Sequence, residues 1–225
     1  MGACPCKRYV ASPAPLSPLE RDRKGRKTDI DETTYACVIA SIEIVRKQVK
    51  SNPEEGLFRV PGRQRDWTRV LHAILRNPDR AKEALSRCSV HDVCSILKQL
   101  LRNIQEENGT LLSKQLYDSF VAARDANAVR QIVNELPAKN KTILMQMSYM
   151  IKEVCENERT RMTTSSFATV ISPNLVLHEG SEQMILQRMM SNNMKELFQI
   201  LVDNTDEIFK EEDRGGMSMS CSNRQ

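Results

Sequence analysis

The sequence predicts an all-α protein, a single helical domain of about seven to nine helices. Apolar residues recur every three or four positions in one segment after another, which is the spacing of a buried helix face. No stretch alternates apolar and polar residues as a half-buried strand does, and no internal repeat is visible. Hydrophobic residues make up 40% and charged residues 28% of the 225 residues, which suits a globular protein with a sizeable core.

The composition changes sharply near both ends of the chain. Residues 1–28 contain four prolines and seven Lys/Arg against two acidic residues, a net charge of +5, and predict a disordered basic tail. Residues 29–225 sum to −1, so the predicted folded domain over 29–212 is nearly neutral. Residues 213–225 are small and polar and predict a second flexible tail.

The first half of the domain divides into helices at polar and proline-containing breaks. A helix is predicted over 31–50, and its pattern stops at Ser51-Asn52-Pro53. The pattern resumes after Gly62 in a helix with an apolar set from Trp67 to Leu75. Asn77 and Pro78 predict a cap and first turn for a short helix that ends near residue 85.

The next helix has the clearest pattern in the sequence. Ser89 opens it, and Asp92 follows three residues later in a box-like capping arrangement. Its apolar stripe is helical in spacing and comprises Val90, Val93, Ile96, Leu97, Leu100, Leu101 and Ile104. Asn108-Gly109 predicts the turn that ends it.

The second half continues in the same way. Helices are predicted around 111–123 and 126–135, and after Leu136-Pro137 a long one runs to about residue 156. A further helix lies within 163–172 and is interrupted near Pro173. The last helix is predicted over 181–211, with a break near 191–193.

Several chemistries have no support in the sequence. HExxH, P-loop, GxGxxG and GxSxG patterns are all missing. Cys88, His91 and Cys94 lie close in sequence, but they lack a second ligand pair, so we expect no metal site. Seven cysteines without a CxxC pair indicate reduced thiols and a cytoplasmic protein. A near-neutral domain with 4% aromatic residues also disfavours nucleic-acid binding.

The N-terminal segment raises a separate hypothesis about membranes. Gly2 would be exposed after removal of Met1, and Cys6 stands where the myristoylation pattern prefers Ser or Thr. Cys4 and Cys6 are candidates for palmitoylation, and the basic residues at 21–27 would attract anionic lipid. An unmodified disordered tail is the alternative. No apolar run approaches the length of a membrane span, and no signal-peptide h-region or CaaX box is visible.

Two cationic features suggest a binding surface. Arg59 lies on the loop EEGLFRVPGR (54–63), between an aromatic residue and a Pro-Gly turn. Lys98 and Arg102 are four residues apart on the helix from Ser89, so they share a face roughly opposite its apolar stripe. That position predicts side chains that point to solvent. A merely solvated face is the alternative reading.

Four segments, in order, resemble the RhoGAP domain family. EEGLFRVPG (54–62) is similar to the arginine-finger loop of that family, and SILKQLLRNI (95–104) to its Leu-Lys-x-x-Leu-Arg helix. NELPAKNKTIL (134–144) resembles its Leu-Pro-x-x-Asn helix start, and RMTTSSFATVISPNLV (161–176) resembles its Met-Thr to Pro-x-Leu segment. Together they cover most of residues 29–212.

The resemblance implies a helical domain that binds a Rho-family small GTPase, of Rho, Rac or Cdc42 type, and accelerates its GTP hydrolysis. Such a protein is not an enzyme on its own and has no cofactor, because the partner carries the GTP and Mg²⁺. The finger arginine of the family falls on Arg59. Its GTPase-contacting lysine falls on Lys98, and the arginine that supports the loop falls on Arg102. Pro173 and Asn174 fall on the turn beside the GTPase groove.

The loop around Arg59 fits this role. We expect Gly56 and Gly62 to let the backbone turn and approach a partner closely. We expect Phe58 to anchor the loop in the core, so that Arg59 points outward.

The sequence departs from the family pattern at two places. Ser166 stands where the family has an asparagine that contacts the GTPase, and a hydroxyl offers fewer donors and acceptors than an amide. Residues 103–109 replace a proline-rich stop with an acidic turn. A GTPase activator with an altered binding surface is therefore one hypothesis, and a non-catalytic adaptor that binds a GTPase without accelerating hydrolysis is the other.

Overall fold

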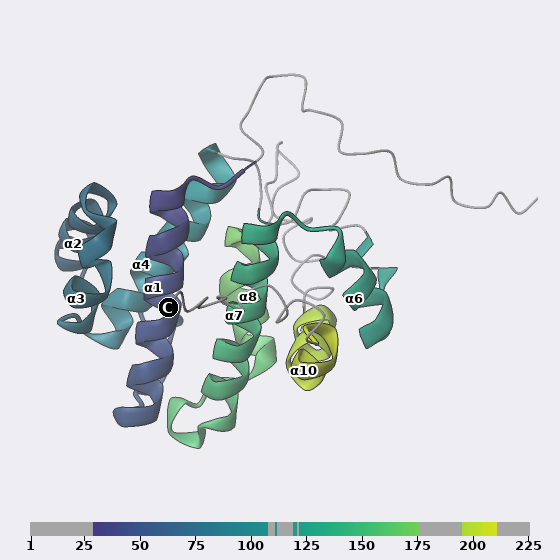
Figure 1. Cartoon of the computed structure of the whole chain (residues 1–225). Coiled ribbons are helices and arrows are strands. Elements are labelled where there is room, and N and C mark those ends of the chain that lie inside the picture. Colours follow the sequence, from purple (N-terminus) through teal and green to yellow (C-terminus); the bar gives the residue numbers. More distant parts are fainter. Residues whose placement is uncertain (1–28, 108–110, 112–118, 121, 176–194, 211–225) are drawn as a thin grey trace, which may run out of the picture.

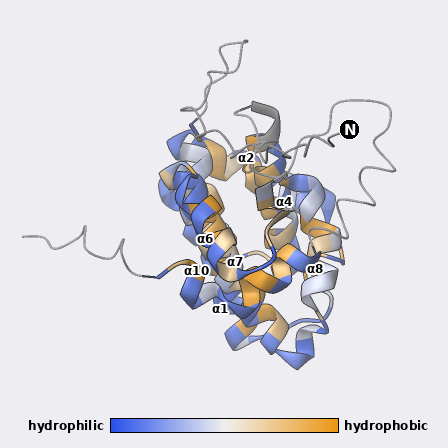
Figure 2. Ribbon diagram, turned by 90° about the vertical axis from the view of Figure 1, so that its right-hand side faces the viewer, coloured by the Kyte–Doolittle hydropathy of each residue, from blue (hydrophilic) through white to orange (hydrophobic). Residues whose placement is uncertain are grey.

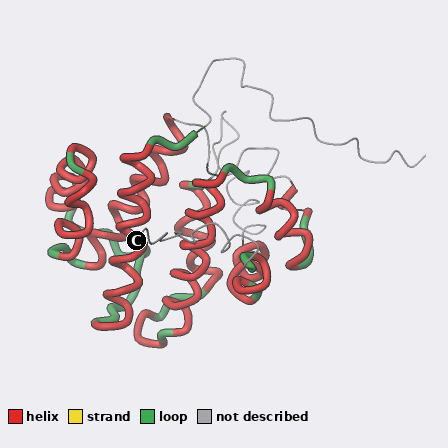
Figure 3. Tube along the Cα trace, viewed as in Figure 1, coloured by secondary structure: helices red, strands yellow, loops and turns green. Residues whose placement is uncertain are grey.

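The computed structural model describes residues 29–107, 111, 119–120, 122–175 and 195–210. Every regular element within these ranges is a helix, as the tube in Figure 3 shows, and this confirms the all-α prediction. Both predicted tails, the candidate acylation residues Gly2, Cys4 and Cys6, and the turn at Asn108-Gly109 lie outside the described residues.

The first half of the domain follows the predicted order of helices (Figure 1). The helix predicted over 31–50 and the helix predicted to begin at Ser89 are both present. Their described ends lie within a residue or two of the predicted ones. The bounds are α1 Glu32–Ser51, α2 Gln64–Arg76, η1 Pro78–Arg80, α3 Ala81–Ser86 and α4 Val90–Glu107.

The second half is also helical, and part of it lies outside the described residues. Most of the helix predicted over 111–123 and the first part of the one predicted over 181–211 cannot be compared. The described end of the helix predicted over 181–211 is helical over 195–203 and turns at Asn204, and the break predicted near 191–193 lies outside the described residues. The bounds are α6 Ala126–Asn134, α7 Ala138–Glu156, η2 Glu158–Thr160, α8 Thr164–Ile171, η3 Ser172–Asn174 and α10 Thr205–Ile208.

Polar side chains fix several helix starts. Asp31 accepts the Thr34 N–H at 2.9 Å before α1, and Asp125 accepts the Ala128 N–H at 2.8 Å before α6. Asn77 stands at the N-cap position of the short η1 turn, as predicted, but its side chain makes no capping hydrogen bond there. Pro78, which needs no N–H partner, does begin that turn.

Helix α1 lies at the centre of the domain. It packs against α3 and α4 on one side and against α7 on the other (Figure 1). Its predicted inner face is buried, since Val38, Ile42 and Val45 are fully enclosed and Val49 is nearly so. Each such side chain removed from water contributes about 1.5–3 kcal/mol to the hydrophobic term. The helices carry hydrophilic residues alongside these apolar ones, as the hydropathy colouring in Figure 2 shows.

A partly buried ion pair joins α1 to α7. Two guanidinium nitrogens of Arg46 donate hydrogen bonds to the Glu153 carboxylate, Nη2 at 2.7 Å and Nε at 2.9 Å. The Arg46 guanidinium also lies 5.8 Å from the centre of the Tyr149 ring. This bidentate geometry fixes the register of α1 against α7.

The described helices include none that combines the length and the apolar character required to cross a bilayer.

Candidate functional site

The loop over residues 52–63, which we call the 52–63 loop, is tightly hydrogen-bonded. The Gly56 N–H donates to the Thr160 carbonyl at 2.8 Å, which ties the loop to η2. The Gly56 carbonyl in turn accepts from the N–H groups of Arg59 at 3.0 Å and Val60 at 2.9 Å. Gly56 has φ +74°, a conformation that only glycine adopts without strain. The predicted turning role of Gly56 is therefore confirmed.

Phe58 anchors the loop in the core, as predicted. Its side chain is buried, and its ring packs 5.1 Å from the Phe167 ring at an interplanar angle of 57°. Phe58 also has φ +65°, which costs about 1–2 kcal/mol for a residue with a Cβ. Strain of this kind persists only where the surroundings hold it, and here it lies directly before the exposed Arg59.

The Arg59 side chain is exposed and only loosely tied. It is 54% exposed, and its Nη2 atom lies 3.7 Å from Glu55 Oε1. The same carboxylate also faces Arg161, whose Nη1 atom lies 3.3 Å from Glu55 Oε2. Ion pairs between such exposed groups contribute about 0–1 kcal/mol, so Arg59 can leave Glu55 at little cost.

Lys98 supports the loop from beneath. Its Nζ atom donates to the Phe58 carbonyl at 2.8 Å, and the side chain is half-buried. Burial lowers the pKa of Lys98; the thiol of Cys94 opposes this, and the charge of Arg102 adds to it. The prediction that Lys98 points to solvent is wrong, because the 52–63 loop packs across that face of α4.

The far end of the loop approaches α4 closely. The Gly62 N–H donates to Ser95 Oγ at 2.9 Å, and the Arg63 N–H donates to Asp92 Oδ1 at 2.8 Å. A Cβ on Gly62 would lie 2.7 Å from the Asp92 Cα atom, so only glycine fits. We expected Gly62 to allow approach of a partner; it instead allows approach of this chain's own helix. The Ser89–Asp92 capping pair is confirmed, with hydroxyl and carboxylate 2.7 Å apart.

Arg102 joins α4 to η3 rather than to the loop. Its Nη2 atom donates to Asn174 Oδ1 at 3.2 Å, and Asn174 Nδ2 donates to the Val170 carbonyl at 3.1 Å. The loop support that the resemblance implied for Arg102 is made by Lys98. Asn174 is buried, whereas the neighbouring Pro173 is half-buried in the first turn of η3.

Ser166 lies in the first turn of α8, one residue before the Phe167 ring that holds Phe58. Its backbone N–H donates to the capping oxygen Thr163 Oγ1 at 3.2 Å, and its hydroxyl lies 3.1 Å from the same oxygen. The hydroxyl is thus already engaged within the chain. The structure places Ser166 beside the loop anchor but leaves its predicted contact with a GTPase as a prediction.

His91 and Cys94, which lie close to Cys88 in the sequence, do not face a common point that could hold a metal ion. His91 Nε2 lies 3.3 Å from Glu54 Oε2, and Cys94 is fully buried, which raises the pKa of its thiol to about 12. Nowhere in the described ranges do three His, Cys, Asp or Glu side chains converge in an arrangement that could hold a metal ion.

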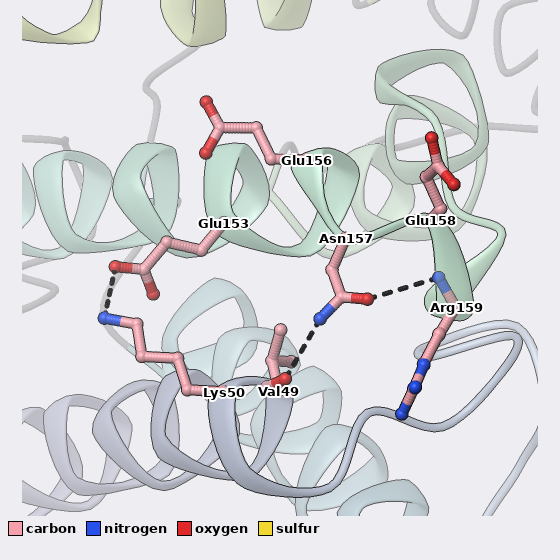
Figure 4. A pocket seen from close by; sticks show the side chains of 7 residues that line it. All are labelled: Val49, Lys50, Glu153, Glu156, Asn157, Glu158 and Arg159. Atoms are coloured by element: carbon pink, nitrogen blue, oxygen red, sulfur yellow. Dashed lines mark hydrogen bonds and ion pairs between the residues drawn. The ribbon is translucent and has the colours of Figure 1, made fainter.

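Two open pockets of about 500 Å³ each lie among the described residues, and Arg59 lines neither of them. In the first, Lys50 Nζ lies 2.9 Å from Glu153 Oε1, and Asn157 Nδ2 donates to the Val49 carbonyl at 3.1 Å (Figure 4). These polar groups therefore satisfy one another. Because both pockets are wide open, neither resembles the enclosed apolar site of a small ligand.

Three supporting residues were missed by sequence reasoning. Thr160 offers only a backbone carbonyl to Gly56, which no side-chain pattern reveals. Glu55 and Arg161 are far apart in sequence, so their shared ion pair at the loop required the fold. Glu55 stands within the quoted motif four residues before Arg59, and that spacing was the one available signal.

Comparison with known proteins decides the family. The sequence model described as the RhoGAP domain matches residues 36–180, which is well over half of the chain. The chain belongs to the RhoGAP domain family. The match covers the loop with Arg59, the helix with Lys98 and Arg102, and the segment from Ser166 to Asn174.

Individual relatives are distant. The chain is 28% identical over 173 residues to the human T-cell activation Rho GTPase-activating protein, covering 72% of this chain and 23% of that protein. It is 25% identical over 181 residues to Rho GTPase-activating protein gacP of Dictyostelium discoideum, covering 76% and 29%. The chain thus spans about a quarter of the length of these curated relatives.

Solved structures share the fold. The BH domain of GRAF, the GTPase regulator associated with focal adhesion kinase, superposes with a TM-score of 0.64 at 22% identity, covering 80% of this chain and 96% of that one. Human Rho GTPase activating protein 15 superposes with a TM-score of 0.60 at 18% identity, covering 86% and 100%. These similarities show that this RhoGAP-family chain has the fold of both domains.

Proposed function

We propose that this protein stimulates GTP hydrolysis by a Rho-family small GTPase, of Rho, Rac or Cdc42 type, through Arg59 inserted in trans as an arginine finger. The observation that carries the proposal is the exposed guanidinium of Arg59 at the apex of a loop whose neighbours on both sides are fixed. Family membership and the names of the relatives support a GTPase as the partner.

The loop is suited to electrostatic catalysis. Charge builds on the phosphoryl oxygens during GTP hydrolysis, and a guanidinium held close to them stabilises that charge most where water is excluded. A finger arginine accelerates hydrolysis by about 10³–10⁵, which is roughly 4–7 kcal/mol. Release of Arg59 from Glu55 costs at most about 1 kcal/mol, so the exchange favours insertion.

The fixed residues around Arg59 would position its guanidinium group precisely. Lys98 holds the Phe58 carbonyl directly before Arg59, and Gly56 closes the turn through two backbone hydrogen bonds. Only the Arg59 side chain must then be ordered on binding, which limits the entropy lost in the transition state. Lysine would be a poor substitute at this position because it lacks the planar fork of donors.

A second candidate function is that of an adaptor that binds a GTPase without activating it. Ser166 favours this alternative, because its hydroxyl is engaged by Thr163 where the family pattern has an amide. The predicted surface of Lys98, Arg102, Ser166, Pro173 and Asn174 would then serve binding alone.

One experiment separates the two functions. Single-turnover GTP hydrolysis is measured for a panel of Rho-, Rac- and Cdc42-type GTPases with and without this protein, together with its affinity for each in the GTP state. Acceleration of any member supports the activator. Tight binding with no acceleration across the panel would replace it with the adaptor.

The location of the protein is also a proposal. We infer a cytoplasmic protein that is peripheral at membranes, with acylation at Gly2, Cys4 or Cys6 and the basic residues of 1–28 as the attachment. Two weak signals together hold a protein stably where one acyl chain does not. Mass spectrometry of the protein from its native cell tests this, and an unmodified N-terminal peptide would rule out the acyl anchor.

A further inference from the structure

Helix α2 carries a stripe of basic residues on its outer face, and we call Arg65, Arg69, His72 and Arg76 the α2 stripe. At 100° per residue these four positions fall within an arc of about 60°. All four side chains are exposed. The arc lies opposite Leu71 and Ile74, the two residues of α2 that are buried in the core.

The α2 stripe lies at the edge of the domain. Helix α2 packs on α4, α1 and α3, and it stands at the periphery on the side of α1 away from α6 and α10 (Figure 1). The stripe therefore has no packing role inside the fold. It extends about 17 Å along the surface, as the 1.5 Å rise per residue gives.

Basic residues on the neighbouring surface of α3 form ion pairs with acidic residues, whereas the arginines of the α2 stripe do not. On α3, Lys82 pairs with Glu43 of α1 at 2.6 Å and Arg87 pairs with Glu83 at 2.7 Å. In the part of the chain that the structure describes, no carboxylate lies within ion-pair distance of Arg65, Arg69 or Arg76. The one acid on the same helix, Asp66, is half-buried and lies three residues before Arg69, about 60° round the helix from it, without reaching ion-pair distance.

From this geometry we propose that the α2 stripe docks onto an anionic membrane surface. Guanidinium groups spread along about 17 Å match a plane of lipid headgroups, whereas recognition of one phosphate group requires arginines that converge on a point. Neither of the two open pockets is lined by a residue of α2. Each basic residue near an anionic membrane surface raises the affinity of a protein for that membrane about fivefold.

The attachment is electrostatic and lacks an inserted apolar anchor. Among the described residues, Val60 is the one large apolar side chain that is exposed, and it lies on the 52–63 loop rather than on α2. Binding by the α2 stripe is therefore expected to weaken steeply as salt screens the charges. The inference rests on the folded domain and does not depend on acylation of the N-terminus or on GTPase activation.

The test compares two triple variants of the full-length chain in vesicle cosedimentation. The stripe variant is R65Q/R69Q/R76Q. The matched control is K47Q/R130Q/R159Q, which removes the same charge from exposed residues scattered over α1, α6 and η2. Vesicles are phosphatidylcholine with about one third phosphatidylserine, or phosphatidylcholine alone, at low and at physiological ionic strength.

We expect the wild type and the control to bind the phosphatidylserine vesicles, and salt to weaken that binding. The stripe variant is expected to bind about a hundredfold more weakly, because three contacts of about fivefold each are lost. Equal binding of the two variants, or no binding of the wild type to phosphatidylserine vesicles, would overturn the proposal. If the triple variant melts early, the three single substitutions replace it, each with an expected loss of about fivefold.

Other occupants of the stripe have distinct outcomes. Affinity of the stripe variant for the GTPase is expected to equal that of the wild type, and a loss there without a loss on vesicles would assign the stripe to the GTPase. Soluble glycerophosphoserine is expected not to compete with vesicles. If the protein binds an acidic phosphopeptide through the α2 stripe but does not bind vesicles, the proposal of membrane docking is refuted.

Discussion

The Nζ atom of Lys98 lies 2.8 Å from the backbone carbonyl oxygen of Phe58, the residue directly before Arg59. The lysine comes from α4 and the carbonyl from the 52–63 loop, 40 residues apart. Because Phe58 has a positive φ and its ring is fixed against Phe167, this bond holds the backbone from which the Arg59 side chain projects.

Replacement of Lys98 tests that support. Lys98→Met keeps the apolar stem but leaves the Phe58 carbonyl without its donor, and a hydrogen bond to a charged group contributes about 1.5–3 kcal/mol. We expect a lower melting temperature and GTPase stimulation reduced at least about tenfold, as a misplaced reacting group loses rate steeply. Lys47→Met, at an exposed position on α1, is the control. Stimulation equal to that of wild type in Lys98→Met would show that the bond is dispensable.

Gly62 offers a test of the other end of the loop. The Cβ introduced by Gly62→Ala would meet the backbone of Asp92, with 2.7 Å to its Cα and 2.8 Å to its N, so the loop must shift. Forced overpacking of this kind costs about 1–3 kcal/mol. We expect chemical denaturation to show a loss in that range, together with weaker GTPase stimulation. An unchanged unfolding free energy would mean that the loop relaxes freely.

The ion pair between α1 and α7 predicts a pH dependence of stability. Burial would raise the pKa of Glu153, but hydrogen bonds from Arg46 and Lys50 and their charges outweigh it and lower that pKa. Since the folded value lies below the unfolded value of 4.5, the pair's stabilisation is present above pH 4.5 and is lost as pH falls through the folded pKa.

Glu153→Gln is therefore expected to lower the free energy of unfolding at pH 7 by about 1–2 kcal/mol, because charge-assisted hydrogen bonds are lost. It should also flatten the dependence of stability on pH below 4.5. Urea titrations across that pH range measure both effects. Glu158→Gln, on the same pocket wall (Figure 4), is the control, and an effect of equal size there would refute the assignment to the ion pair.

Ser166→Asn addresses the departure from the family pattern. An amide reaches farther than a hydroxyl that Thr163 already engages, and it offers both a donor and an acceptor to a partner. One added interface hydrogen bond contributes about 0.5–1.5 kcal/mol, so we expect affinity for the GTPase to rise about 2- to 12-fold. Titration of the GTP-bound partner measures it. Unchanged or weaker binding would show that residue 166 does not contact the GTPase.

Periodicity was sufficient to predict most of the longer helices, because each of α1, α2, α6 and α7 buries apolar residues at helical spacing. The anchor role of Phe58 could also be predicted, since a large aromatic residue in a polar loop has few other fates. The position of Lys98 could not. Helical geometry placed it opposite the apolar stripe, but the 52–63 loop folds over that face of α4 and supplies a carbonyl there.

The partners of the charged residues also could not be predicted from the sequence. Arg102 reaches Asn174, 72 residues later, and Glu55 reaches Arg161, 106 residues later. These contacts depend on how α4, α8 and η3 meet, which local patterns do not specify. The family resemblance identified Arg102 and Asn174 as site residues, but the structure was needed to join them to each other.

The central claim is that Arg59 acts as a finger and not as a binding residue. The most direct measurement is single-turnover GTP hydrolysis by the responsive GTPase with wild type, Arg59→Ala and Arg59→Lys, with affinity for the GTP-bound partner measured in parallel. Arg130→Ala, at an exposed arginine of α6, is the matched control. We predict that stimulation falls by about 10³ or more in Arg59→Ala, stays low in Arg59→Lys, and is unchanged in Arg130→Ala, while affinity changes little. Full stimulation by Arg59→Ala, or a loss explained entirely by weaker binding, would contradict the account.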